Sequence, residues 1–207
     1  MIVVVDYGAG NITSVVKALE AVGATVRVES DPRHAGGALG LVVPGVGHFA
    51  ATGPLQELWR RPALEAIGRG LPVLGICLGM QWLFEGSEEA PDATGLGIFG
   101  GRCVRLRDEV KVPHVGWNTI DAPVSGSVVA DLGAGASAYF AHSFAAPIVQ
   151  HTVATTTYGD RFSSAVARGS VCGVQFHPEK SGRTGLKLLA NFVALVKDAP
   201  SSCWPAA

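Results

Sequence analysis

The strongest constraint on the fold comes from two short runs, residues 2–5 and 73–76, that are apolar at every position. A strand with one face in water alternates apolar and polar residues, because successive side chains point to opposite faces. A strand without this alternation is covered on both faces, which is typical of a parallel sheet packed between helices. The runs therefore predict a sheet buried on both sides.

Strand and helix patterns alternate through the first 85 residues, as in repeated strand–helix–strand units. The helix expected at 12–22 carries its apolar residues at helical spacing. This order predicts an α/β fold with an open, mostly parallel, doubly wound sheet and helices on both faces. The strands are expected at 2–6, 25–29, 39–43 and 72–76, and the helices at 12–22, within 54–69 and from 78 to about 85.

The second half of the chain is dominated by strands without clear helices between them, which predicts an antiparallel or mixed β extension. A final helix is expected at 184–197. The chain shows no internal repeat and no second domain, so we expect a single domain at 1–197 and a disordered tail at 198–207. The candidate strands are 99–106, 115–121, 138–144, 150–157, 163–168 and 171–176.

Composition argues against several classes of protein. The chain has 16 Lys and Arg against 17 Asp and Glu, for a net charge of −1, which argues against a nucleic-acid-binding protein. Residues 39–55 come closest to a membrane span, but proline and glycine interrupt them, so no transmembrane helix is expected. The four cysteines lie far apart without a paired spacing, and the start of the chain does not resemble a signal peptide. These features predict a cytoplasmic protein.

Cys77 stands between two glycines in the sequence GICLG, where an apolar strand ends and a helical pattern begins. This is the thiol counterpart of the G-x-S-x-G nucleophile elbow, in which a tight turn exposes the nucleophile. Backbone N–H groups at the start of the following helix would favour a thiolate. A buried core cysteine fits the five residues equally well.

A cysteine nucleophile needs a base and a group that orients the base. His177 lies where an apolar strand ends, and Pro178 favours an extended backbone at His177. Residues two apart in an extended segment point to the same side, so Glu179 could hold the imidazole. A surface turn is the alternative for these three residues. A metal site is not expected, because no second histidine has ligand spacing.

Two glycine-containing turns follow other strands. The turn at 44–47, with the sequence PGVG, could direct backbone N–H groups of Val46 and Gly47 at an oxyanion, together with the N–H of Leu78. An ordinary strand-to-helix turn is the alternative. The turn at 7–11 lacks the third glycine of a dinucleotide fingerprint and the lysine of a P-loop, which argues against nucleotide binding.

Taken together, these stretches resemble the class I, triad-type glutamine amidotransferases. The likeness is narrower to the glutaminase subunits of imidazole glycerol phosphate synthase, an enzyme of histidine biosynthesis, and it covers about residues 1–197. The motifs that carry it are DYGAGN at 6–11, GICLGMQ at 75–81, PHVGWN at 113–118, YFAHSF at 139–144 and HPEKSG at 177–182.

The resemblance implies a mechanism. Cys77 would attack the side-chain amide of L-glutamine to form a γ-glutamyl thioester, His177 would transfer the proton, and Glu179 would hold the imidazole. Val46, Gly47 and Leu78 would stabilise the oxyanion, without a cofactor or a metal. Many relatives carry tyrosine where this chain has Phe144, which weakens a substrate role for that side chain. The residues implied to hold glutamine are Gln81, Glu89 and the backbone around Ser143.

The resemblance also implies a partner, a (β/α)₈ cyclase subunit bound one to one, into which ammonia passes. By composition alone, Trp117 would more often be a core residue and Lys180 a solvated charge. The positions implied to face the cyclase are Asn11, Trp117, Asn118, Tyr139 and Lys180.

Three alternatives remain open at this stage. The chain could be the glutaminase of another synthase, such as pyridoxal phosphate synthase, although the DYGAGN stretch counts against it. It could be a free-standing Cys-His-Glu hydrolase, which would be fully active without a partner. It could also be a binding module without catalysis, which the presence of Cys77, His177 and Glu179 argues against.

Overall fold

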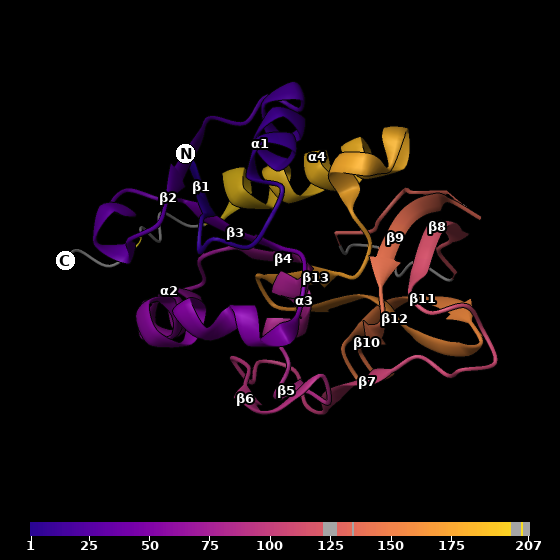
Figure 1. The fold of residues 1–207 in the computed structure, drawn as a ribbon. Coiled ribbons are helices and arrows are strands. Elements are labelled where there is room, and N and C mark those ends of the chain that lie inside the picture. The colour runs from indigo at the N-terminus through magenta and orange to yellow at the C-terminus, as the bar shows by residue number, and fades with distance from the viewer. Residues whose placement is uncertain (122–127, 134, 200–203, 205–207) are drawn as a thin grey trace.

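The computed structural model describes residues 1–121, 128–133, 135–199 and 204. A seven-stranded sheet crosses the molecule in the order β11-β12-β13-β4-β3-β1-β2 (Figure 1). The strands from β13 to β2 are parallel, and β12 and β11 add antiparallel pairs at one edge. Their bounds are β1 Ile2–Val5, β2 Val26–Glu29, β3 Gly40–Gly45, β4 Val73–Cys77, β11 Thr152–Tyr158, β12 Asp160–Arg168 and β13 Val171–Val174.

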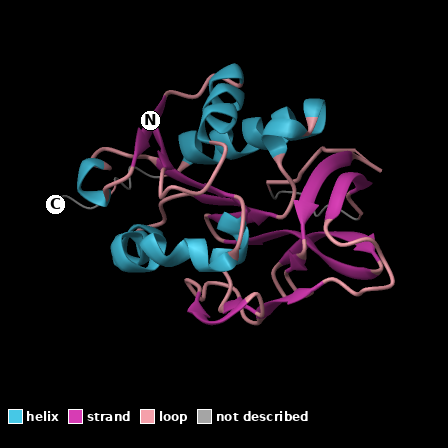
Figure 2. Cartoon of the chain, viewed as in Figure 1, coloured by secondary structure: helices cyan, strands magenta, loops and turns pink. Residues whose placement is uncertain are grey.

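Helices cover both faces of this sheet (Figure 2). Alternate residues of β1 enter different apolar clusters: Ile2 and Val4 pack with α1 and α4, and Val3 and Val5 pack on the side of α2 and α3. The double coverage explains why the strand has no polar position. The helices are α1 Ile12–Ala21, α2 Arg60–Gly68, α3 Leu78–Trp82 and α4 Gly182–Asp198, with a π-helical turn at Leu55–Trp59 and 3₁₀ turns at Pro32–His34, Phe49–Thr52 and Pro178–Lys180.

The remaining strands form two small sheets beside the carboxyl ends of β4 and β13. One has the order β10-β7-β5-β6, and the other pairs β8 with β9 in antiparallel fashion. The sequence pattern missed β5 and β6, because residues 86–94 form a short segment with three acidic residues and a proline and without apolar alternation. The bounds are β5 Gly86–Ser87, β6 Ala90–Thr94, β7 Arg102–Arg105, β8 His114–Thr119, β9 Ser137–His142 and β10 Phe144–Ala145.

The predicted α/β class with a parallel doubly wound sheet is confirmed, and so is its mixed extension. The strands of the second half are divided between sheets: β11, β12 and β13 join the main sheet, whereas β7, β8, β9 and β10 belong to the two small sheets. In the part of the chain that the structure describes, no helix combines the length and the apolarity needed to cross a membrane.

The predicted disordered tail, 198–207, falls mainly outside the described residues. Asp198 still belongs to α4. Trp204 differs from the expectation, because it is buried against Trp59 with ring centroids 5.6 Å apart. Its indole Nε1 donates a hydrogen bond to the Pro32 carbonyl at 3.0 Å.

Candidate active site

Cys77 sits in a strained turn between β4 and α3. Its backbone has φ 53° and ψ −106°, an unusual conformation for a residue with a side chain. The two flanking glycines are required by close packing. A Cβ on Gly79 would lie 1.8 Å from the carbonyl oxygen of Val43, and a Cβ on Gly75 would lie 2.6 Å from the Gly79 oxygen. The turn therefore has the geometry of a nucleophile elbow.

His177 and Glu179 form a buried ion pair beside this turn. The Nδ1 atom of His177 lies 2.9 Å from Oε1 of Glu179, and each side chain is 2 % exposed. Burial by itself lowers the pKa of His177, but interactions with Cys77 and Glu179 outweigh burial and raise that pKa to about 10. The Nε2 atom of His177 is buried and has no hydrogen-bond partner among the described residues, so it is free for proton transfer.

β4 and β13 bring these residues together. The two strands are parallel neighbours, with Val174 opposite Ile76, so Cys77 and the segment that leads to His177 leave the sheet at the same edge. Ligand sites of open α/β sheets lie at the carboxyl ends of the strands. The ends of β4 and β13 meet in this way only because the chain crosses from one strand to the other over almost a hundred residues.

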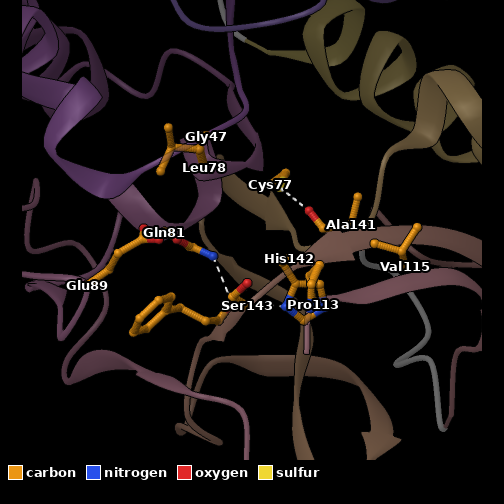
Figure 3. Close-up of a pocket in the computed structure, with 11 residues that line it drawn as sticks. Gly47, Cys77, Leu78, Gln81, Glu89, Pro113, Val115, Ala141, His142 and Ser143 are labelled. Carbon is orange, nitrogen blue, oxygen red and sulfur yellow. Dashed lines mark hydrogen bonds between the residues drawn. The ribbon is translucent and has the colours of Figure 1, made fainter. Parts of the chain in front are cut away.

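A pocket of about 360 Å³ opens next to Cys77 (Figure 3). It contains all three residues predicted to hold glutamine and two of the three predicted oxyanion residues. Val46 belongs to the same turn as Gly47, and its side chain is 40 % exposed. The lining residues are Gly47, Cys77, Leu78, Gln81, Glu89, Pro113, Val115, Ala141, His142, Ser143 and Phe144.

Hydrogen bonds hold the polar side chains of the pocket in place. The Nε2 atom of Gln81 donates to the carbonyl oxygen of Phe144 at 2.9 Å. The Oε2 atom of Glu89 accepts the backbone N–H of Phe49 at 2.7 Å. Phe144 thus contacts Gln81 through its backbone carbonyl.

Three buried polar residues near the pocket were missed by the sequence analysis: His114, His142 and Gln175. Burial lowers the pKa of His142 to about 3 and that of His114 to about 4. Nδ1 of His114 lies 3.1 Å from Nε2 of His142. A signal was present, because His142 lies inside the quoted YFAHSF stretch and His114 inside PHVGWN, but their pairing depends on the register of β8 and β9.

The residues predicted to face a partner divide into two groups. Trp117 is 60 % exposed and pairs across the strands with Tyr139, with ring centroids 6.3 Å apart. The ammonium group of Lys180 lies 5.7 Å from the centre of the Tyr139 ring. Asn11 is exposed at the N-terminus of α1, where it caps the helix through Ser14.

Asn118 does not join this surface. It follows Trp117 in a strand, so its side chain points to the opposite face. There its Nδ2 atom donates to the Thr157 carbonyl at 3.1 Å and lies 3.3 Å from Nε2 of His114.

The chain is similar to known proteins over nearly its whole length. Residues 3–196 match the family model described as "Glutamine amidotransferase class-I". A relative from Thermococcus kodakarensis is 48% identical, with 93% of this chain and 98% of that protein covered. A relative from Salinibacter ruber is 45% identical, with 94% of each covered. Both are named imidazole glycerol phosphate synthase subunit HisH.

Solved structures share the fold. A structure described as a glutamine amidotransferase has a TM-score of 0.74 at 20% identity, covering 94% of this chain and 98% of that one. The structure of PurLQS from Thermotoga maritima has a TM-score of 0.72 at 18% identity, covering 93% of this chain and 97% of the other. At this identity they bear on the fold alone. By the family match and by its relatives, the chain belongs to the class-I glutamine amidotransferases, in the group of the HisH subunits of imidazole glycerol phosphate synthase.

Proposed function

We propose that this chain is the glutaminase subunit of an imidazole glycerol phosphate synthase in histidine biosynthesis. In this function it hydrolyses L-glutamine to glutamate and delivers the ammonia to a cyclase subunit. The observation that carries the proposal is the buried His177–Glu179 pair beside the Cys77 elbow, in a chain whose relatives are named as subunits of that synthase.

In the proposed reaction, the Cys77 sulfur attacks the side-chain carbonyl carbon of glutamine. His177, held at Nδ1 by Glu179, carries the proton that leaves the thiol and gives it to the departing ammonia. Water then attacks the thioester, with His177 as the base, and glutamate is released. The free Nε2 atom of His177 supports this assignment, because it is the atom that must exchange protons with the sulfur and with water.

The oxyanion of each tetrahedral intermediate would be stabilised by backbone N–H groups of the turn at Val46 and Gly47 and by the N–H of Leu78. Gly47 and Leu78 line the same pocket as Cys77, which supports this role. Gln81, Glu89 and the backbone at Ser143 would hold the glutamine, since all three lie in that pocket. The reaction needs no cofactor or metal in this scheme.

The proposed partner is a (β/α)₈ cyclase subunit bound one to one. Trp117, Tyr139 and Lys180 support a docking surface, because the exposed indole and the half-buried phenol lie together with a cation beside them. Aromatic residues at such a surface supply much of the binding energy of an interface. We also propose a cytoplasmic location, which the free state of the three described cysteines supports.

The test uses the chain together with its cyclase. Replacing Cys77 by alanine should abolish synthesis from glutamine and leave synthesis from added ammonia intact, because the cyclase site is unchanged. The matched control is Cys172→Ala, which removes a different buried thiol and should retain synthesis from glutamine. Glutamine-dependent turnover in the Cys77→Ala complex would refute the assignment of the nucleophile.

The same assay separates this function from a free-standing hydrolase. The proposed subunit should show low glutaminase activity alone and a strong increase with the cyclase and its nucleotide substrate. Full activity in the isolated chain, without a response to the cyclase, would favour the free-standing enzyme instead.

A further inference from the structure

The side-chain amide of Gln175 lies against the sulfur of Cys77. Its Nε2 atom is 3.6 Å from Sγ, and the side chain is fully buried. The position follows from the parallel register of β13 and β4, in which Val174 is opposite Ile76. Gln175 and Cys77 are the residues that directly follow this pair. We propose that Gln175 is a further catalytic residue, which donates an N–H hydrogen bond to the Cys77 sulfur and stabilises its thiolate.

The donor must be the nitrogen of Gln175 and not its oxygen, and neighbouring groups decide this. The carbonyl oxygen of Phe144 can only accept hydrogen bonds, so the atom of Gln81 that lies 2.9 Å from it is the amide nitrogen. The same nitrogen lies 3.1 Å from Gln175, which must therefore present its oxygen there. The nitrogen of Gln175 is left facing the sulfur.

A second branch reaches the same carbonyl from the other side. Nδ1 of His142 lies 2.9 Å from the Phe144 oxygen and must carry a hydrogen. Burial keeps the ring neutral, so its Nε2 atom accepts from Nδ1 of His114 at 3.1 Å. Nε2 of His114 in turn accepts from Nδ2 of Asn118 at 3.3 Å.

The far end of this branch is fixed independently. Asn118 donates from Nδ2 to the carbonyl oxygen of Thr157 at 3.1 Å, and its Oδ1 accepts the backbone N–H of Thr119 at 2.8 Å. One backbone group can only accept and the other can only donate, so the amide has a single orientation. Each hydrogen bond between Asn118 and Cys77 therefore has a fixed direction. The Phe144 carbonyl accepts from His142 on one branch and from Gln81 on the other. Gln81 in turn donates to Gln175, and Gln175 donates to the sulfur.

This orientation has a chemical consequence. A hydrogen bond donated to a charged group is stronger than one donated to a neutral group, so an N–H aimed at the sulfur stabilises thiolate more than thiol. The site is buried, and Cys77 is only 5 % exposed, so little water is available to do the same. Gln175 thus donates to the Cys77 thiolate the hydrogen bond that water donates to an exposed thiolate. Gln81, held by the Phe144 carbonyl, is the positioning residue in this scheme.

The inference rests on the proposed glutaminase function, but its test does not need glutamine turnover. The rate at which iodoacetamide alkylates Cys77 is measured against pH in the complex with the cyclase, with the Cys77 peptide quantified by mass spectrometry. The thiolate displaces iodide, so the midpoint of the profile reports thiolate formation. Gln175→Met keeps an unbranched buried side chain without the amide. We expect the midpoint to rise by about one pH unit, the equivalent of about 1.4 kcal/mol.

Two further variants make the result decisive. Gln81→Met leaves Gln175 in place but removes the donor that orients it, and should raise the midpoint by a smaller amount. It also covers the case in which Gln175→Met does not fold. Thr156→Val is the matched control: it removes a buried hydrogen bond to the Thr119 carbonyl that is not part of this chain of contacts, and should leave the midpoint unchanged.

Equal midpoints in wild type and in the folded Gln175 and Gln81 variants would overturn the inference, even if the enzyme hydrolyses glutamine. A wild-type complex that does not hydrolyse glutamine would overturn the proposed function instead, and a raised midpoint in Gln175→Met would still support the role of the amide. The two failures are therefore distinguishable.

Discussion

Acid should destabilise this protein well before its carboxylates titrate, because His114 and His142 are buried without charge. The pKa of His142 is lowered to about 3, first by burial and then by the neighbouring His114, and the pKa of His114 is lowered to about 4 by burial. Other titratable groups beside the pair are His177, which lowers the pKa of His142 further, and Tyr158, whose ring stacks on His114 at 3.9 Å.

The sign follows from proton binding. Below pH 6.5 the unfolded chain protonates both imidazoles, whereas the native state leaves them neutral until about pH 4. Unfolding therefore takes up protons in this window, and the free energy of unfolding falls as the pH falls. A group that is protonated in the unfolded state and neutral in the native state changes the free energy of unfolding by about 1.4 kcal/mol per pH unit. His142 alone should thus lower stability by about 1 kcal/mol from pH 6 to pH 5, and His114 should bring the loss to about 2 kcal/mol.

His177 acts in the opposite direction at higher pH. Its pKa is raised to about 10, so the stability it contributes is fully present below pH 6.5 and is lost as the pH rises toward 10. Stability should therefore be greatest near pH 6.5.

The measurement is urea-induced unfolding of the isolated chain at intervals of half a pH unit from 4.5 to 7.5. The comparison is His142→Asn, whose amide can still donate to the Phe144 carbonyl but does not titrate, and which should show a clearly shallower slope below pH 6.5. If the slope of the variant equals that of the wild type, the buried imidazoles do not cause the acid sensitivity and the reasoning is refuted.

Three other outcomes follow from the structure. Gly79→Ala should lower the free energy of unfolding by about 3 kcal/mol or more in thermal melting, since the new Cβ would lie 1.8 Å from the Val43 carbonyl oxygen. The control is Gly53→Ala, where no atom lies within 4 Å of the new Cβ. An equal loss of stability in both variants would contradict the argument. Glu179→Gln should reduce glutamine-dependent turnover by about 100-fold or more while ammonia-dependent turnover persists, and unchanged glutamine kinetics would remove Glu179 from the mechanism. Trp117→Ala should weaken cyclase binding, measured by calorimetry, by about 2 kcal/mol. The stability of the isolated chain should not change, because Trp117 is 60 % exposed. A loss of stability with normal cyclase binding would show that Trp117 is a core residue instead.

Much of the fold could be predicted because local patterns decide it. The apolar strands at 2–5 and 73–76 and the helical spacing in 12–22 reflect burial on one or both faces, which each segment records in its own residues. The short strands β5 and β6 could not be predicted, because β5 pairs with both β6 and β7 and these pairings depend on contacts with the rest of the molecule.

The candidate site divides in the same way. Cys77 between glycines, and His177 two residues before Glu179, are local arrangements that made these residues candidates. A core cysteine and a surface turn fitted the same residues, and the family resemblance favoured the catalytic interpretation. Trp117 and Asn118 show what local patterns could not predict. Both were predicted to face a partner, but neighbouring residues of a strand point to opposite faces of the sheet. Only the pairing of β8 with β9 shows which of the two is exposed.

The sequence by itself determined the class of fold, because apolar periodicity is a property of neighbouring residues, and its motifs made Cys77 and His177 the candidate nucleophile and base. The tertiary structure alone decided that Gln175 lies against the Cys77 sulfur, and that His142 and Gln81 donate to the same Phe144 carbonyl in one connected chain of hydrogen bonds. That chain joins segments up to a hundred residues apart. Its geometry depends on strand register and on which buried groups can only donate or only accept, and neither property is visible in a single stretch of residues.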